Sequence, residues 1–386
     1  MRILHTVEFY HPSVGGAQEV VKRVSEALAR RGHEVTVATT RLPDRTSRQI
    51  NGVQIVEFDI SGSAGVGIRG DLRPYLMLLK HGSFDLMMNY AAQQWATDLA
   101  MVVLPELPYK KMLVPFGFSQ LHNDLFRWYF ERMPDVLRQY DHLIVHSNGY
   151  TDGEFCRQHG LAHTTLVPNG ASEEEFSRVD PTFRRRYGIP ADVPMLLTVG
   201  SHTGLKGHAK SMRAFLESSI GRAVLVIVGN TPVAPGCLPR CRRLSRAVRF
   251  LSLGRKRVLL LDPPREDVVA AFHAADLFVF CSQVEGSPIV LFEAMASRTP
   301  FVTLDVGNAR EIVEWSGGGV VVPSQHLPDG RTVAPAGDVA RQITELMRDR
   351  DGRQRLAEAG HRAWQERFTW EKIVGMYEEV YRRVCQ

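Results

Sequence analysis

Short apolar runs alternate along the chain with longer segments whose apolar residues recur at helical spacing. The first run is RILHTV, and residues 17–31 after it place Val20, Val21, Val24 and Leu28 on one helical face. Further runs of the same kind are EVTVATT, FDLMMNY, KMLVPF, HLIVHS and TTLVP. Strands separated by helices form βαβ units, so this alternation predicts a parallel sheet with helices on both faces.

The alternation is interrupted between residues 169 and 194, a charged, turn-rich stretch with three prolines. A second set of strand-like runs follows, namely MLLTVG, AVLVIVG, RVLLLD, LFVFCS, PFVTLD and GGVVV. The pattern predicts an α/β protein of two Rossmann-like, doubly wound domains facing a cleft. We assign residues 1–170 to the first domain, 171–194 to a linker and 195–367 to the second domain. A C-terminal helix at about 368–386 is expected to pack back on the first domain. Ligands of such sheets bind at the carboxyl ends of the strands.

Composition narrows the class of protein. The 386 residues are 44% hydrophobic and 23% charged, which is typical of a globular chain of two or three domains. No apolar run reaches the roughly 18 residues of a membrane span, and the start MRILHTVEFYHP lacks the features of a signal peptide. Five scattered cysteines indicate reduced thiols, so we expect a cytoplasmic protein. Cys237 and Cys241 are isolated from other ligand types, and no metal site is predicted.

The net charge of +5 is concentrated in one segment. Eight basic residues and no acid lie between Arg240 and Arg257. Such a run is typical of a solvated surface or of a surface that meets anionic lipid. The stretch Asn123–Tyr140 mixes aromatic and basic residues, which suits either a core or a lipid interface. Attachment to the inner membrane face therefore stays open, whereas no nucleic-acid-binding motif is present and nucleic acid is not expected as a partner.

The segment VEGSPIVLFEAMA, residues 284–296, follows the strand-like run LFVFCS. Ser287 can cap a helix and Pro288 suits its first position, so the segment predicts a strand–loop–helix junction. The unpaired amides of Ile289 and Val290 would then form a phosphate site at the helix N-terminus.

Glu285 and Glu293 would flank that phosphate site. Glu285 lies in the loop, and Glu293 lies inside the helix, roughly 7 Å along from Pro288 by helix rise. Carboxylates accept hydrogen bonds from vicinal hydroxyls, so a diphosphate with a sugar on each side, a nucleotide-sugar, fits the arrangement. The alternative is an ordinary helix with solvated acids.

At this point the chain resembles the retaining nucleotide-sugar glycosyltransferases of the GT-B fold, glycosyltransferase family four, of the group 1 type. The glutamate pair of EGSPIVLFE matches their hallmark, and the resemblance spans nearly the whole chain. The other matching segments are HPSVGGAQEVVKRVSEALARRGHEVTVAT, LVPNGASEEEF, LTVGSHTGLKGHAKSMRAF and FTWEKIVGMYEEVY.

The resemblance implies roles for the residues of the second domain. Glu285 should contact hydroxyls of the transferred sugar as the catalytic-site glutamate, and Glu293 should contact the ribose. The amides that follow Gly286, those of Ser287, Ile289 and Val290 around Pro288, should hold the distal phosphate.

Lys206 in GLKG should pair with the diphosphate, because the leaving group gains negative charge as the glycosidic bond breaks. In the first domain, Gly15 and Gly16 resemble a glycine loop whose bare backbone approaches the phosphate, for which glycine permits positive φ.

Two positions depart from the family pattern. Ser201 and His202 stand where an arginine usually precedes the lysine, and His202 could supply a weaker, pH-dependent donor. Phe116 stands where many members carry a sugar-contacting histidine, and His122, six residues on, is the candidate to compensate. The departures point to an altered donor sugar or to weak catalysis.

The sequence therefore predicts a retaining glycosyltransferase of polysaccharide or glycolipid biosynthesis. Its donor would be a nucleoside diphosphate sugar, its acceptor a saccharide or lipid-linked saccharide, and it would need no cofactor and no metal. Two alternatives remain at this stage. One is a non-catalytic nucleotide-sugar-binding or scaffold protein, and the other is a sugar-nucleotide epimerase of the same fold.

Overall fold

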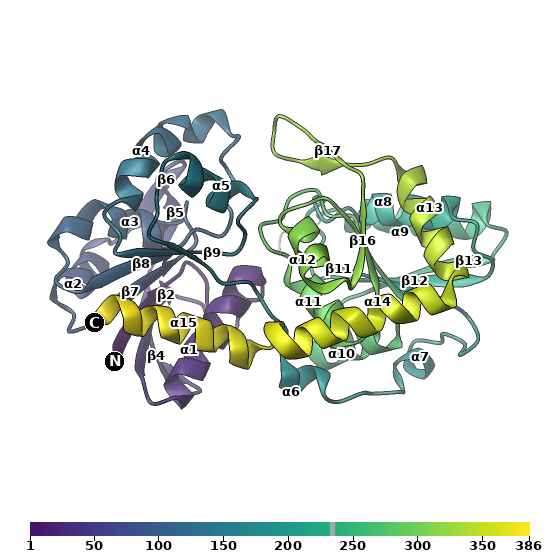
Figure 1. Cartoon of the computed structure of the whole chain (residues 1–386), viewed down its shortest axis with the longest axis horizontal. Coiled ribbons are helices and arrows are strands. Elements are labelled where there is room, and N and C mark those ends of the chain that lie inside the picture. Colours follow the sequence, from purple (N-terminus) through teal and green to yellow (C-terminus); the bar gives the residue numbers. More distant parts are fainter. Residues whose placement is uncertain (232–235) are drawn as a thin grey trace. The chain divides into compact units, whose positions relative to one another are not determined.

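The computed structural model describes residues 1–231 and 236–386. The chain forms two compact units (Figure 1). The first unit contains Met1–Asn169 together with Trp370–Gln386, and the second contains Gly170–Thr369.

The first unit is built around an eight-stranded sheet in the order β10-β9-β8-β7-β1-β2-β4-β3. Its strands are β1 (Arg2–Thr6), β2 (Glu34–Thr40), β3 (Gln49–Ile50), β4 (Val53–Phe58), β7 (Leu86–Tyr90), β8 (Lys110–Val114), β9 (His142–Val145) and β10 (Thr164–Leu166). Only β3 runs antiparallel to its neighbour, and β5 (Ile60–Ser63) and β6 (Gly67–Gly70) form a separate hairpin. The strand order reverses between β1 and β7.

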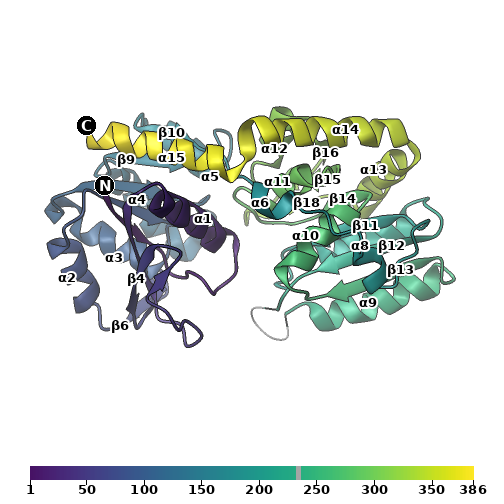
Figure 2. The same cartoon turned by 90° about the horizontal axis from the view of Figure 1, so that it is seen from below.

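The helices of the first unit come from both ends of the chain. They are α1 (Gly16–Arg30), α2 (Arg73–His81), α3 (Trp95–Val103), η1 (Leu104–Glu106), η2 (Asp124–Phe126), α4 (Arg127–Leu137), α5 (Thr151–Gln158) and α15 (Trp370–Cys385). Helix α15 lies beside α1 in both views (Figures 1 and 2). Arg31, just after α1, forms ion pairs of 2.8 Å with Glu378 and 2.6 Å with Glu371 of α15.

The second unit has a parallel six-stranded sheet in the order β13-β12-β11-β14-β15-β16. Its strands are β11 (Met195–Val199), β12 (Ala223–Val228), β13 (Lys256–Leu261), β14 (Leu277–Phe280), β15 (Phe301–Leu304) and β16 (Gly319–Val322). A small antiparallel pair, β17 (Gln325–His326) and β18 (Thr332–Val333), lies outside this sheet. The strand order reverses between the neighbours β11 and β14, which is where open α/β sheets bind ligands.

The helices of the second unit follow its strands in the alternation that the sequence predicts. They are α6 (Glu173–Phe176), α7 (Phe183–Arg186), α8 (His208–Glu217), α9 (Leu238–Leu251), α10 (Arg265–Ala274), α11 (Ile289–Ala296), α12 (Ala309–Ser316), α13 (Ala336–Arg348), α14 (Arg350–Ala363) and the π-helical turn η3 (Trp364–Phe368). Strands β7 and β12 are buried at every position, because helices cover both faces of a parallel sheet. The two-domain, Rossmann-like α/β fold predicted from the sequence is confirmed.

Residues 171–194, predicted as a linker, fold as part of the second unit. Two aromatic side chains within this charged stretch, Phe176 and Phe183, are buried. The Arg184 guanidinium also donates to the carbonyl of Ala274, at 2.8 Å from Nη2. Aromatic anchors therefore hold a segment whose prolines and charges alone favour a loop.

None of the helices in the two described ranges is long and apolar enough to cross a bilayer.

Candidate functional site

The loops after β11 and β14 meet at the point where the strand order of the second unit reverses. Lys206 lies in the first loop and Glu285 in the second, and Lys206 Nζ is 2.6 Å from Glu285 Oε1. The backbone joins the same loops, because the amide of Gln283 donates to the carbonyl of Leu205 at 2.8 Å. The structure thus brings together two residues that the sequence predicts to handle the diphosphate and the sugar.

Gly207 explains how the two loops approach so closely. Its φ of +69° is left-handed, and a Cβ at this position would lie 1.8 Å from the carbonyl oxygen of Cys281. Only glycine tolerates both the conformation and the contact. A larger residue here would push the loop of Lys206 away from the end of β14.

Helix α11 begins at the end of the loop that carries Glu285. Pro288 is its N-cap residue, with extended backbone, and the helix starts at Ile289. The prediction that Ser287 is the cap and Pro288 the first helical residue is wrong by one position, because the ψ of 108° at Pro288 is not helical. The amides of Ile289 and Val290 still occupy the first turn, where backbone N–H groups lack helical acceptors and the helix dipole is positive.

The neighbouring loop after β15 supports this junction. The amide of Asn308 donates to the carbonyl of Gly286 at 3.0 Å. Gly307 has a φ of +57°, and a Cβ there would lie 2.4 Å from the same carbonyl oxygen. The loop after β15 therefore holds the segment around Gly286 in place.

Glu293 is paired with an arginine that the sequence analysis did not identify. Arg265, the first residue of α10, places Nη2 2.5 Å from Glu293 Oε1 and 2.7 Å from Glu175 Oε2. Burial acts to lower the pKa of Arg265, but the carboxylates of Glu293 and Glu175 raise it above its ordinary value. The Glu293 side chain is only 7% exposed, so this arginine neutralises and orients a carboxylate that water cannot solvate well.

A signal for Arg265 exists in the sequence. It follows Pro263 and Pro264 in the segment DPPRED, directly after the strand-like run RVLLLD. An arginine at the carboxyl end of a parallel strand lies at the ligand-binding edge of the sheet. Its partner, however, is set by the packing of α10 against α11, which a sequence pattern does not specify.

His202, predicted as a weak hydrogen-bond donor to the diphosphate, has a buried ring. Its Nδ1 lies 3.4 Å from Cys237 Sγ and 3.2 Å from Nδ1 of His208. Burial lowers the pKa of His202. The charge of Arg242 lowers it further, whereas the charge of Asp262 raises it. A lowered pKa leaves the ring uncharged at neutral pH, so it does not replace the cationic arginine of the family pattern.

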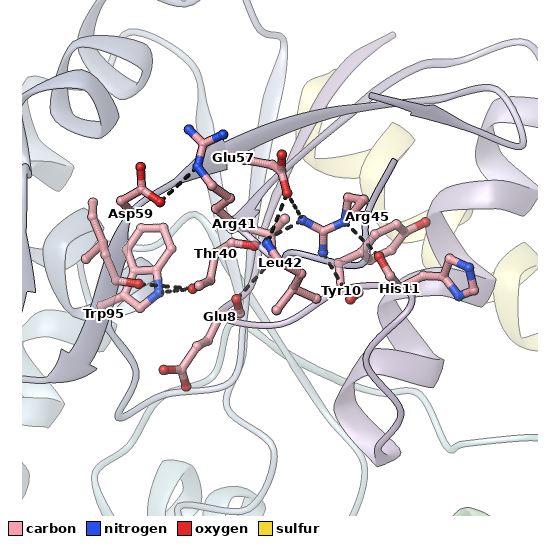
Figure 3. Close-up of polar contacts among 12 residues, drawn as sticks. Glu8, Tyr10, His11, Thr40, Arg41, Leu42, Arg45, Glu57, Asp59 and Trp95 are labelled. Atoms are coloured by element: carbon pink, nitrogen blue, oxygen red, sulfur yellow. Dashed lines mark hydrogen bonds and ion pairs between the residues drawn. The ribbon is translucent and has the colours of Figure 1, made fainter. Parts of the chain in front are cut away.

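In the first unit, a buried arginine holds the loop between β1 and α1 (Figure 3). Arg45 donates to the carbonyls of His11 at 2.8 Å and Tyr10 at 3.1 Å, and forms an ion pair of 2.6 Å with Glu57. Sequence reasoning missed Arg45, because the segment that carries it shows no strand or helix period. Its side chain is only 1% exposed, so it acts as an internal support for the loop that leads to the two glycines.

Gly15 and Gly16 follow that loop at the start of α1. Gly15 is the N-cap residue with extended backbone, and neither glycine has the positive φ that the sequence analysis expects. A Cβ added at Gly16 would meet nothing within 4 Å in the described structure. Backbone strain therefore does not explain either glycine. The open space at Gly16 suits the close approach of a ligand, whereas a Cβ at Gly15 would lie 2.5 Å from Oε1 of Gln18.

Left-handed residues cluster at the carboxyl ends of β7 and β8 in the first unit. Ala91 and Gln93 follow β7 with φ of 65° and 64°, and Phe116 and Phe118 follow β8 with φ of 58° and 45°. Side chains other than glycine rarely adopt this region, and such strain concentrates at functional sites.

Phe116, which departs from the family pattern, packs against a histidine that the sequence analysis did not select. The ring centroids of Phe116 and His146 are 5.1 Å apart, and burial lowers the pKa of His146 to about 4. His122, the predicted substitute, is exposed in the loop between β8 and α4. The predicted residues therefore fall into two groups, with Gly15, Gly16 and His122 in the first unit and the others in the second.

Two family models match successive parts of the chain, one in each structural unit for most of its length. Residues 14–175 match the family model of Glycosyltransferase Family 4, and residues 179–363 match that of Glycosyl transferases group 1.

Two relatives cover almost the full length. An N-acetyl-alpha-D-glucosaminyl L-malate synthase of Bacillus anthracis is 24% identical over 97% of this chain and 96% of its own. A D-inositol 3-phosphate glycosyltransferase of Xylanimonas cellulosilytica is 29% identical over 100% of this chain and 96% of its own.

Solved structures share the fold at low sequence identity. A sucrose-phosphate synthase from Thermosynechococcus elongatus is similar with a TM-score of 0.77 and 20% identity, over 100% of this chain and 99% of its own. Anabaena Alr3699/HepE, solved in complex with UDP-glucose, is similar with a TM-score of 0.76 and 16% identity, over 99% of this chain and 100% of its own.

Proposed function

Because the chain belongs to the group 1 glycosyltransferases of the GT-B fold, we propose that it transfers a sugar from a nucleoside diphosphate sugar with retention of configuration. The acceptor in this proposal is a saccharide or a lipid-linked saccharide. The observation that carries the proposal is the Lys206–Glu285 pair, which lies beside the N-terminus of α11.

The donor would lie along these groups in a defined direction. Its diphosphate would accept hydrogen bonds from the first amides of α11 and from Lys206. Glu285 would then be released from Lys206 to accept from hydroxyls of the transferred sugar, and Glu293, oriented by Arg265, would accept from the ribose. The ion pairs keep each carboxylate neutralised while no donor is bound.

This arrangement supports heterolysis of the bond between the sugar and the diphosphate. As the bond breaks, its electron pair moves to the departing phosphate oxygen, where Lys206 and the positive end of α11 stabilise the growing charge. The acceptor oxygen forms the new bond on the same face of the sugar, and its proton passes to the departing phosphate oxygen. No protein nucleophile is required.

A panel of nucleoside diphosphates and their sugars tests the donor. Nucleotides that carry one particular base should stabilise the protein against thermal unfolding. The stabilisation should be about 2.7 kcal/mol when the ligand is at 100 times its dissociation constant. Because Alr3699/HepE was solved with UDP and UDP-glucose, uridine and glucose come first in the panel.

Turnover is then measured with saccharide acceptors, and with L-malate and inositol 3-phosphate, which the names of the two relatives suggest. Transfer that is lost in Glu285→Gln, with nucleotide stabilisation kept, supports the proposal. Binding without transfer or donor hydrolysis would favour the scaffold alternative, and a changed sugar configuration without acceptor would favour the epimerase.

We also propose that α9 brings the protein to an anionic membrane surface. All basic residues of the run Arg240–Arg257 except Lys256 are exposed, as are the apolar Phe250, Leu251 and Leu253 near the end of the helix. Exposed arginines next to exposed apolar side chains suit a lipid interface. Lys256 does not take part, because its ammonium group is buried and donates to the carbonyls of Phe215 and Ser218, each at 2.6 Å.

A further inference from the structure

Four potential metal ligands converge in the second unit, outside the Lys206–Glu285 pair. His202, His208, Cys237 and Cys241 place one ligand atom each within 4.8 Å of all the others. His202 lies in the loop after β11, and His208 is the first residue of α8. Cys237 is the N-cap of α9, and Cys241 follows it one helical turn later. In the described part of the chain this is the one cluster of its kind.

Backbone hydrogen bonds bring the segments that carry these side chains together. The amide of Cys237 donates to the carbonyl of His202 at 2.9 Å, and the amide of His202 donates to the carbonyl of Asn230 at 2.8 Å. Gly236 has a φ of +50°, and a Cβ there would lie 2.0 Å from the His202 carbonyl oxygen. Glycine is thus required for the approach that brings Cys237 to His202.

Four of the six distances between ligand atoms in the cluster are close to the edges of a tetrahedron around zinc. Zinc bonds of about 2.05 Å to nitrogen and about 2.3 Å to sulfur give edges of roughly 3.3 Å between nitrogens, 3.5 Å between nitrogen and sulfur, and 3.8 Å between sulfurs. The two Nδ1 atoms are 3.2 Å apart, and the two Sγ atoms are 3.8 Å apart. Cys237 Sγ lies 3.4 Å from Nδ1 of His202 and 3.8 Å from Nδ1 of His208.

The chemistry of the ligands agrees with the geometry. Two thiolates and two imidazoles in a tetrahedral arrangement favour zinc over magnesium or calcium, because magnesium and calcium prefer oxygen ligands. His202, His208 and Cys241 are buried and Cys237 is half-buried, so the cluster is screened from water. Thiols are weak hydrogen-bond donors, and hydrogen bonding alone satisfies such a buried group poorly.

We propose that His202, His208, Cys237 and Cys241 bind one zinc ion as a closed, structural site. Four protein ligands leave no coordination position for water or substrate, so the ion would not take part in the transfer reaction. It would instead fasten the loop that carries Lys206, which lies between the two histidines, to the start of α9. The sequence alone predicts no metal here, because the two cysteines lie far along the chain from the two histidines.

Metal content of the full-length, tag-free protein, purified under reducing conditions, tests the proposal. We expect about one zinc per chain by mass spectrometry. Replacing zinc by cobalt should give the strong visible bands of tetrahedral cobalt and a thiolate charge-transfer band in the near ultraviolet. Cys237→Ser, Cys241→Ser and His208→Asn should each lose the bound zinc and the cobalt spectrum.

Cys385→Ser is the matched control, since this half-buried thiol lies in the first unit and its loss should leave the zinc in place. Circular dichroism separates loss of metal from loss of the fold in the variants. The cobalt titration of the unaltered protein does not depend on any variant. If the reduced, metal-free protein takes up neither zinc nor cobalt at micromolar concentrations, or if cobalt binds without a charge-transfer band, the site does not exist as proposed.

Discussion

Lys206 has a partner within the chain, because its ammonium group is 2.6 Å from the Glu285 carboxylate. A bound diphosphate must therefore replace the Glu285 carboxylate, whose side chain is only 13% exposed, as the ion-pair partner of Lys206. The replacement of one anion by another keeps the charge of the lysine balanced throughout. It also makes the two residues respond in opposite ways to mutation.

Lys206→Ala should weaken binding of the nucleoside diphosphate by about 1.5–3 kcal/mol, the value of a hydrogen bond to a charged group. Binding of the bare nucleoside should change little, because it carries no phosphate. Glu285→Gln should leave nucleoside diphosphate binding unchanged or tighter, since Lys206 loses its competing partner. Isothermal titration calorimetry with both ligands measures these differences.

Lys110→Ala is the control, because it removes a lysine from a surface ion pair with Asp141 in the first unit. An equal loss of affinity for nucleoside and nucleoside diphosphate in Lys206→Ala would contradict the assigned phosphate contact.

Sequence and structure agree best for residues that lie inside motifs. Short segments of the sequence indicate Glu285, Glu293 and Lys206, and the structure places Glu285 and Lys206 in contact. Arg265 and His146 were not selected, since each acts on a residue far from it in the chain. Such partners follow from how helices and strands pack, and no local pattern records that packing.

At the scale of elements, the strands were the most predictable part of the chain. Runs such as AVLVIV are apolar throughout and become β12, which is buried at every position. Element ends were less predictable, as the start of α11 illustrates. The sequence of segment 171–194 favours a loop because its buried apolar residues, among them Phe176, Phe183, Ile189 and Val193, are few and follow no strand or helix spacing.

Helix α9 carries the prediction of membrane binding. Arg242, Arg243 and Arg246 are exposed, and each basic residue near an anionic surface contributes about 1 kcal/mol at low salt. Replacing all three by serine should reduce sedimentation with vesicles that contain phosphatidylserine, and the difference should fade as salt shortens the Debye length. Binding to neutral vesicles should be weak for both proteins.

Replacing Arg348, Arg350 and Arg355 by serine provides a control with the same change of net charge. These arginines are exposed at the end of α13 and on α14, among acidic residues such as Asp349 and Asp351. If this control loses as much vesicle binding as the α9 variant, net charge and not α9 is responsible.

At the scale of the whole molecule, buried histidines set the response to acid. Burial lowers the pKa of His5 from 6.5 to about 3, and that of His146 to about 4. Both are neutral in the folded chain, whereas the unfolded chain takes up their protons as the pH falls through 6.5. Proton uptake then favours unfolding, so stability falls with pH from about 6.5 down toward 4.

Each such histidine should lower the free energy of unfolding by about 1.4 kcal/mol for each unit by which the pH falls over that window. We expect the thermal midpoint of the first unit to fall between pH 7 and pH 5, and to fall less steeply in His5→Gln. Scanning calorimetry across this range provides the measurement. Tyr381→Phe is the control, because it removes the hydroxyl 3.1 Å from His5 Nε2 and leaves the titrating ring.

Tyr381→Phe should lower the midpoint by a similar amount at every pH and keep the slope of the unaltered protein. A slope that is identical in His5→Gln and the unaltered protein would assign the acid response to other groups.

The return of α15 to the first unit has a consequence for the order of events during synthesis. The chain enters and leaves the second unit at one place, where the amide of Ala171 donates to the carbonyl of Phe368 at 3.0 Å. The second unit is thus complete in sequence as soon as Thr369 has left the ribosome. The first unit, although translated earlier, still lacks the helix whose Glu378 and Tyr381 bind Arg31 and His5. The first unit therefore needs residues that are translated after the whole of the second unit, and a chain that stops before Trp370 would lack the helix that contacts Arg31 and His5.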